Sequence, residues 1–234
     1  MLLLHTETCG RSYLLKIMQI KISKIEPTTN IMNIIIMIFM KRSGVMAIKI
    51  FIDQGHNPTG FHNTGAVGQG LFEQDITYQV GVYLAELLNN DPRFDARLSR
   101  PTADTVLGTN NATSLAERVR LANTWPADYF ISIHANASVN PAANGTEVYI
   151  YRRYTQANWL AEQVLDGIVE TVGTRNNGVR VNSSLYVLRR TNMPAILVEM
   201  AYISNPSDAE KLRDNQFGFA NGIYKGILRY FGFA

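Results

Sequence analysis

The chain has 234 residues, of which 46% are hydrophobic and 18% are charged. This length can bury one sizeable core but leaves little for a second domain. The net charge of +3 comes from residues 1–46, where six basic residues meet two acidic ones, so the remainder carries about −1. Residues 47–234 are thus nearly neutral, which argues against nucleic-acid binding. The single cysteine, Cys9, lies before them, so residues 47–234 cannot form a disulfide framework or a thiolate metal cluster.

Residues 1–46 are predicted to be a leader or an upstream segment. The apolar stretch 31–40 (IMNIIIMIFM) is too short to cross a bilayer as an ordinary helix, so no stable membrane span is expected. Lysines precede this stretch, as in a signal peptide, but Lys41 and Arg42 follow it directly and no clear cleavage site appears. A weak signal or anchor and an upstream read-through segment both remain open, and a single domain is expected over 47–234.

From Ala47 onward, short apolar runs alternate with longer stretches of helical period, which is typical of an α/β domain. Continuous apolar runs suit strands that are covered on both faces. Strands are predicted at residues 48–52, 129–133, 148–151 and 195–198, with weaker candidates at 96–99 and 185–188.

Helices are predicted between these runs from apolar spacing and from capping residues. Apolar residues three and four apart predict helices over 73–88 and 157–172, the second with Trp159 in its buried stripe. Ser114 and Glu117 form a possible capping box before a helix over about 115–123. Asn205 followed by Pro206 predicts a helix start, and a last helix is expected over about 217–230.

Chemically capable side chains follow three of the predicted strands. The first strand leads into Asp53 and His56, the second ends at His134, and the run 195–198 ends at Glu199. If these strands are parallel, their carboxyl ends share one edge of the sheet, where open α/β folds place ligands. Glu73, at the start of the first helix, adds a second carboxylate to this edge.

This set of side chains matches the needs of a metal-dependent hydrolase. Two histidines and a carboxylate can hold a catalytic zinc ion, with a fourth position left for water. A further carboxylate can move the proton from that water to the leaving nitrogen. No compact motif such as HExxH fixes the geometry, so ordinary loop and strand-end histidines remain an alternative on spacing alone.

Several short motifs, in this order, resemble those of the zinc-dependent N-acetylmuramoyl-L-alanine amidases of the amidase 3 type. The resemblance covers essentially all of 47–234 and implies an α/β fold, a single domain with a mixed, mostly parallel sheet of about six strands flanked by helices. The motifs are Asp53-Gln-Gly-His56, Gly65-Ala-Val-Gly68, Glu73-Gln-Asp75, 118–123, Ala127-Asp128, Ser132-Ile-His134-Ala-Asn136-Ala, Pro194-Ala-Ile-Leu-Val-Glu199 and Ile203-Ser-Asn205.

The resemblance also implies residue roles. His56, Glu73 and His134 would bind Zn²⁺, and Glu199 would act as general base and later protonate the departing amine. The implied reaction is hydrolysis of the peptidoglycan amide between N-acetylmuramic acid and L-alanine, which implies a cell-wall or extracellular location. The chain departs from the family at residues 57–64, which separate the first motif from its usual glycines.

Further residues are assigned more weakly. Asn136, Arg189 and Arg190 are candidates for substrate binding. Asn136 can form a hydrogen bond to the substrate, and the guanidinium groups of the two arginines suit stem-peptide carboxylates. Asp53 and Asp75 are candidates to accept hydrogen bonds from the metal-bound imidazoles. His62 is expected to be a surface loop side chain, and Arg118 to make a structural contact.

Two other functions remain open from the sequence. A zinc peptidase that trims stem peptides would share the same metal site. A non-catalytic cell-wall-binding module could retain the pocket without the chemistry, although the presence of all four proposed site residues argues against that. The oligomeric state is not predicted.

Overall fold

The structure is a computed structural model that describes residues 46–234. Residues 1–45 of the predicted leader, including Cys9 and the apolar stretch 31–40, lie outside the described residues. Within residues 46–234, no helix combines the length and the apolar character needed to cross a membrane.

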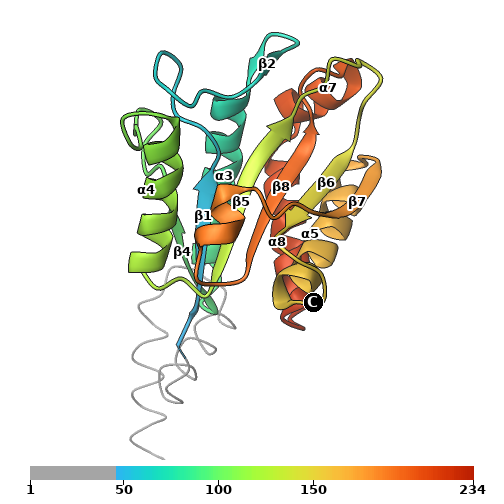
Figure 1. The fold of residues 1–234 in the computed structure, drawn as a ribbon. Helices are drawn as coiled ribbons and strands as arrows, with labels where there is room; N and C mark the ends of the chain where they lie inside the picture. The colour runs from blue at the N-terminus through green and yellow to red at the C-terminus, as the bar shows by residue number, and fades with distance from the viewer. Residues whose placement is uncertain (1–45) are drawn as a thin grey trace, which may run out of the picture. The chain divides into compact units, whose positions relative to one another are not determined.

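Six strands form one mixed sheet in the order β4-β1-β5-β8-β6-β7 (Figure 1). Neighbouring strands are parallel except for β6 and β8, which are antiparallel. This confirms the predicted fold class. The strands are β1 (Ile48–Gln54), β4 (Phe94–Leu98), β5 (Tyr129–Asn136), β6 (Thr146–Ile150), β7 (Asn176–Val181) and β8 (Ala195–Tyr202), and a separate hairpin joins β2 (Val67–Gly68) to β3 (Leu71–Phe72).

Helices cover both faces of this sheet. The helices are α3 (Glu73–Asn89), α4 (Asn111–Thr124), α5 (Gln156–Val172), α6 (Tyr186–Arg190), α7 (Pro206–Asp214) and α8 (Gln216–Tyr230). Helices α3, α5 and α8 share the larger hydrophobic core, while α4 and α6 share a smaller core on the other face. In β1, Ile50 and Ile52 belong to the larger core and Phe51 to the smaller one, which explains the uninterrupted apolar run.

The strand predictions were correct except at one place. The weak candidate at 96–99 corresponds to β4, but the candidate at 185–188 is wrong because this segment forms the short helix α6. The sixth strand is instead β7, with the sequence NNGVRV. It is an edge strand that pairs only with β6, so it can be polar and its sequence lacks the apolar run of a central strand.

The helix predictions were correct in position but wrong in two details. Helix α4 begins earlier than expected, because Asn110 and Thr113 form the capping box in place of Ser114 and Glu117. Trp159 is 57% exposed, although it was expected in the buried stripe of α5. It directly precedes the buried Leu160, and one residue turns an α-helix by about 100°, so Trp159 points away from the core.

Candidate metal centre and active site

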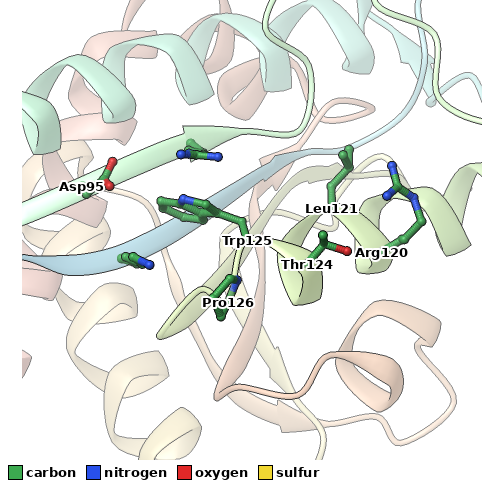
Figure 2. A pocket seen from close by; sticks show the side chains of 8 residues that line it. Asp95, Arg120, Leu121, Thr124, Trp125 and Pro126 are labelled. Atoms are coloured by element: carbon green, nitrogen blue, oxygen red, sulfur yellow. The ribbon is translucent and has the colours of Figure 1, made fainter.

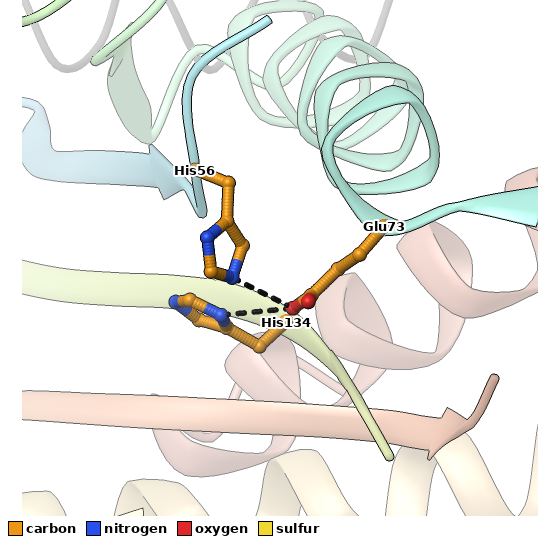
Figure 3. A group of neighbouring side chains, drawn as sticks. All are labelled: His56, Glu73 and His134. Atoms are coloured by element: carbon orange, nitrogen blue, oxygen red, sulfur yellow. Dashed lines mark hydrogen bonds and ion pairs between the residues drawn. The ribbon is translucent and has the colours of Figure 1, made fainter. Parts of the chain in front are cut away.

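Three polar side chains meet at the carboxyl ends of β1 and β5. His56 lies in the loop after β1, Glu73 is the first residue of α3, and His134 lies near the end of β5. One possible ligand atom from each lies within 4.8 Å of the others. Figure 3 shows both imidazoles directed at the carboxylate of Glu73. The structure thus brings together the three residues predicted to bind metal.

The three side chains converge on one carboxylate oxygen. Oε1 of Glu73 lies 3.1 Å from Nε2 of His56 and 3.0 Å from Nδ1 of His134. The two imidazole rings meet edge to face, with 4.8 Å between their centroids. Two imidazole nitrogens and one carboxylate oxygen are the donor set of many catalytic zinc sites, so these residues fit that ion.

Hydrogen bonds from the backbone hold these side chains in their orientations. Nδ1 of His56 lies 3.2 Å from the carbonyl oxygen of Asn63, a contact that would keep a proton on Nδ1 and leave the lone pair of Nε2 to a bound metal ion. The carboxylate of Glu73 accepts hydrogen bonds from the amides of Ala66, at 2.8 Å, and Ala135, at 3.0 Å. Main-chain groups of two segments, the loop 55–66 and β5, therefore position these side chains.

Two glycines leave the space that these side chains occupy. A Cβ atom at Gly55 would lie 2.5 Å from Cε1 of His134, and one at Gly65 would lie 2.7 Å from Oε2 of Glu73. Both distances are shorter than non-bonded atoms tolerate. Any larger residue at either position would displace His134 or Glu73.

Glu73 is 4% exposed yet negatively charged at neutral pH. Burial alone raises the pKa of its carboxyl, but hydrogen bonds and charge interactions with His134 and His56 outweigh burial and hold the pKa well below its usual range. The cluster therefore offers an anionic ligand between two imidazoles, as binding of a divalent cation requires.

The backbone of His56 adopts a left-handed conformation, with φ of 70°. This conformation is uncommon for residues other than glycine and costs on the order of 1–3 kcal/mol. It directs the His56 carbonyl to two buried arginines: Nη2 of Arg118 donates to it at 2.6 Å and Nη1 of Arg100 at 3.4 Å. These bonds offset the strain and fix the loop that carries the ligand.

Asp53 does not contact an imidazole, which corrects the prediction that it would. Its carboxylate accepts a hydrogen bond from Nη1 of Arg118 at 2.6 Å and from the hydroxyl of Ser132 at 2.8 Å. Both members of the Asp53–Arg118 pair are only 1% exposed. Asp53 therefore acts on His56 indirectly, through the arginine that holds the His56 carbonyl, and Arg118 makes the structural contact that was predicted.

Stability is expected to depend on the charge of Asp53. Burial raises the pKa of this carboxyl, but Arg118 and Ser132 lower it more, so the folded pKa lies below the unfolded value of about 3.9. The resulting stability is complete above the unfolded pKa and is lost as pH falls through the folded pKa. Asp53→Asn should lower the free energy of unfolding by about 2 kcal/mol at pH 7, and this difference should shrink below pH 4.

Urea unfolding at a series of pH values measures this difference directly. Asp214→Asn serves as the control, because Asp214 is exposed at the end of α7, and should change stability by less than about 0.5 kcal/mol. A difference between Asp53→Asn and the unsubstituted protein that stays constant from pH 7 to pH 3 would contradict the assignment.

Two other predicted positions also differ from expectation. Asp75 is exposed in the first turn of α3 and makes no hydrogen bond to His56 or His134 in the described part of the chain, so it does not orient them. His62 is half-buried rather than a free surface residue. Its Nε2 lies 3.0 Å from the carbonyl oxygen of Leu107, so it fastens the loop after β1.

Glu199 lies next to the cluster of His56, Glu73 and His134. It pairs with His134 across the parallel strands β5 and β8. Burial raises the pKa of Glu199 well above its usual range, and the charges of Glu73 and Glu147 raise it further. Its Oε2 is buried and has no hydrogen-bond partner among residues 46–234. A carboxyl group in this state is suited to accept and release protons.

A second buried carboxylate, Glu147 on β6, was not predicted from the sequence. It is 2% exposed and directly faces Glu199 on β8. Oε1 of Glu147 accepts a hydrogen bond from Nδ2 of Asn136 at 2.6 Å, and Arg180 forms an ion pair with Oε2. The amide of Asn136, a predicted substrate contact, is thus engaged with Glu147. The sequence signal was a glutamate inside an apolar run, TEVYI, where a charge needs a partner.

The structure does not bring Arg189 and Arg190 to this site. Both are exposed in the last turn of α6. The carbonyl oxygen of Arg190 accepts a hydrogen bond from Asn123 at the end of α4, just before β5 begins. The Arg190 carbonyl therefore lies near the amino end of β5, whereas His134 lies near its carboxyl end. The short helix, which was mistaken for a strand, accounts for this difference.

A separate cavity of about 500 Å³ also lies away from the metal cluster (Figure 2). It is near the beginning of β1, whereas His56 follows the end of that strand. In it, Trp125 lies between two cations, with Arg97 4.6 Å and Lys49 5.8 Å from its ring centroid. It contains none of the predicted site residues, and its lining is Lys49, Asp95, Arg97, Arg120, Leu121, Thr124, Trp125 and Pro126.

Known proteins resemble this chain in sequence. Residues 50–229 match a family model described as N-acetylmuramoyl-L-alanine amidase. N-acetylmuramoyl-L-alanine amidase LytC of Bacillus subtilis (strain 168) is 36% identical over 196 residues, and the match covers 81% of this chain but 37% of LytC. N-acetylmuramoyl-L-alanine amidase CwlM of Bacillus licheniformis is 37% identical over 188 residues, which are 79% of this chain and 69% of CwlM.

Solved structures give the same result. The N-acetylmuramoyl-L-alanine amidase from Clostridium difficile 630 has a TM-score of 0.71 at 32% identity, covering 80% of this chain and 97% of that one. Amidase AmiC2 of Nostoc punctiforme has a TM-score of 0.69 at 35% identity, covering 79% and 97%. The sequence and the fold both agree with these matches, and the chain belongs to the N-acetylmuramoyl-L-alanine amidase family.

Proposed function

We propose that residues 47–234 are a catalytic domain that hydrolyses the peptidoglycan amide between N-acetylmuramic acid and L-alanine. The observation that carries this proposal is the convergence of His56, Glu73 and His134 beside Glu199, whose Oε2 has no hydrogen-bond partner in the described part of the chain. Family membership supports the choice of substrate.

The proposal assigns Zn²⁺ to the three-residue cluster. His56 would bind through Nε2, His134 through Nδ1 and Glu73 through its carboxylate. A zinc ion bound there supplies a Lewis acid that polarises the scissile carbonyl and lowers the pKa of the attacking water. Nitrogen and oxygen donors in a two-to-one set, held by backbone hydrogen bonds, support zinc over cations that prefer oxygen ligands alone.

Glu199 is assigned the proton transfers. Its Oε2 is free to accept the proton of the attacking water and then to deliver it to the nitrogen of the departing alanine. A raised pKa suits both steps, because the same group must first take up the proton and then release it. Asn136 and Glu147 lie beside Glu199 and help to fix the surrounding surface.

The substrate implies where this domain acts. Peptidoglycan is the proposed partner, and the proposed location is the cell wall or the extracellular space. The nearly neutral body, with a net charge of about −1 outside residues 1–46, supports a partner other than nucleic acid.

Product analysis with and without metal tests this function. Purified protein is expected to release new alanine amino termini from purified cell walls, without new reducing sugar ends. Dialysis against a zinc chelator should stop this release, and added Zn²⁺ should restore it. Metal analysis should find about one zinc ion per chain before dialysis, its loss after dialysis, and about one ion again after Zn²⁺ is added.

The same experiment separates the rival functions. Free termini of later stem-peptide residues, with the muramoyl amide intact, would indicate a zinc peptidase. Wall binding without any new termini would indicate a non-catalytic module. Cleavage that continues after complete removal of metal would reject the zinc assignment.

A further inference from the structure

Within residues 46–234, no helix covers one face of strands β6 and β7. Helix α5 packs against these strands from the side of the larger core. In Figure 1, α5 and α8 lie behind them and no labelled helix lies in front. Glu147 faces Glu199 across β6 and β8, and Arg180 pairs with Tyr149, two residues after Glu147. Residues that pair across neighbouring strands point to the same face of a sheet, and so do residues two apart in one strand. Arg180 and Tyr149 therefore lie on the same face as Glu147 and Glu199.

Arg180 is held at one edge of its guanidinium group. Its Nε forms an ion pair with Oε2 of the buried Glu147, while its side chain remains 52% exposed. Among residues 46–234, no hydrogen bond engages its two terminal nitrogens. The terminal nitrogens form a planar fork, and this geometry matches a carboxylate.

Glu147 is fixed by further contacts, so it can orient the arginine. The hydroxyls of Tyr149 and Tyr202 each donate to its Oε1 at 3.2 Å, and Asn136 donates at 2.6 Å. Oε2 is thereby left to Arg180. A buried carboxylate with this many donors is fixed in orientation and holds the guanidinium group in one place.

The distance from the site of cleavage fits a particular part of the substrate. Neighbouring strands lie about 4.8 Å apart, so a guanidinium group beside Glu147 is roughly 5–10 Å from Glu199. An extended residue spans about 3.3–3.6 Å, so this distance corresponds to the second residue after the scissile amide. A free carboxylate on that residue would therefore lie within reach of the terminal nitrogens of Arg180.

We propose that Arg180 binds the free carboxylate of the second stem-peptide residue and so determines substrate specificity. The assignment rests on the proposed amidase function. The uncovered face of β6 and β7 receives the peptide, and the terminal nitrogens of Arg180 meet its carboxylate in place of water. Arg180 takes the role that the sequence suggested for Arg189 and Arg190.

Two synthetic muramoyl peptides test this assignment, one with the second-residue carboxylate free and one with it amidated. The full chain with zinc is expected to cut the free-carboxylate substrate with a kcat/KM about tenfold higher, mainly through a lower KM. Arg180→Gln should reduce that kcat/KM about tenfold, so that both substrates are cut alike. Arg180→Lys should recover only part of the preference, because an ammonium group lacks the planar fork.

Arg152→Gln is the matched control, because Arg152 is exposed beyond the opposite end of β6 and should keep the full preference. Equal kcat/KM values of the unsubstituted protein for both substrates would overturn the assignment, as would an equal loss on both in Arg180→Gln. If Arg180→Gln does not fold, the substrate preferences of the unsubstituted protein and Arg180→Lys decide the question. Failure to release alanine from either substrate would instead reject the proposed amidase function.

Discussion

Replacing Glu199 with glutamine is expected to lower kcat about 1000-fold without loss of the metal. Glutamine has nearly the same shape as glutamate, but its amide cannot take a proton from water and return it to the leaving amine. The substitution also removes a charge that is unfavourable beside Glu73 and Glu147, so the melting temperature should stay the same or rise. Release of alanine amino termini, zinc content and thermal unfolding measure the three effects.

Glu210→Gln is the control for this substitution, because Glu210 is an exposed glutamate of α7. It should retain full activity. If Glu199→Gln retained more than about a tenth of the activity, Glu199 could not be the principal proton carrier. Loss of zinc in parallel with activity would assign Glu199 to metal binding instead.

Replacing Arg118 with leucine is expected to lower the free energy of unfolding by about 3–5 kcal/mol, because it leaves a buried carboxylate without its partner. Asp53 would keep only its bond to Ser132, and the carbonyl of His56 would lose its shortest hydrogen bond. Since His56 carries a proposed ligand atom on a strained backbone, zinc affinity should fall as well. Denaturant unfolding and competition with a coloured chelator measure the two effects.

Arg120→Leu provides the matched control on the same helix. The side chain of Arg120 is 58% exposed and pairs with Glu117 at the surface, so its loss should cost less than about 1 kcal/mol. A double replacement of Asp53 and Arg118 should cost less than the sum of the two single replacements, because it leaves no unpaired charge. Equal stability of Arg118→Leu and Arg120→Leu would contradict the role given to the buried pair.

The central sheet could be predicted because its strands are apolar on both faces. Residues such as Ile52 and Phe130 are fully buried or nearly so, and such runs leave few alternatives to a central strand. The edge strand β7 could not be recognised in this way, because half of its residues are polar and it pairs on one side only. The apolar run at 148–151 likewise does not indicate that β6 is antiparallel to β8.

The meeting of His56, Glu73 and His134 beside Glu199 could be predicted because strand ends fix where side chains lie. His134 and Glu199 each end an apolar run, and parallel neighbours bring such ends together. The contacts of Asp53 could not be predicted, since its partner Arg118 lies 65 residues away on a helix. Glu147 was missed for a related reason: its role depends on an antiparallel pairing that places the beginning of one strand beside Glu199.

The antiparallel pairing of β6 with β8 has a consequence for how relatives of this domain can diverge. The connection from β5 to β6 leaves the sheet beside His134 and returns beside Glu199, so both of its ends are at the rim of the reaction site. Val139 and residues 140–142 are exposed, which means that extra residues there would not disturb the core. Lengthening this single connection would enclose the proposed reaction site more fully and change which substrates reach it, while His134 and Glu199 stay in place.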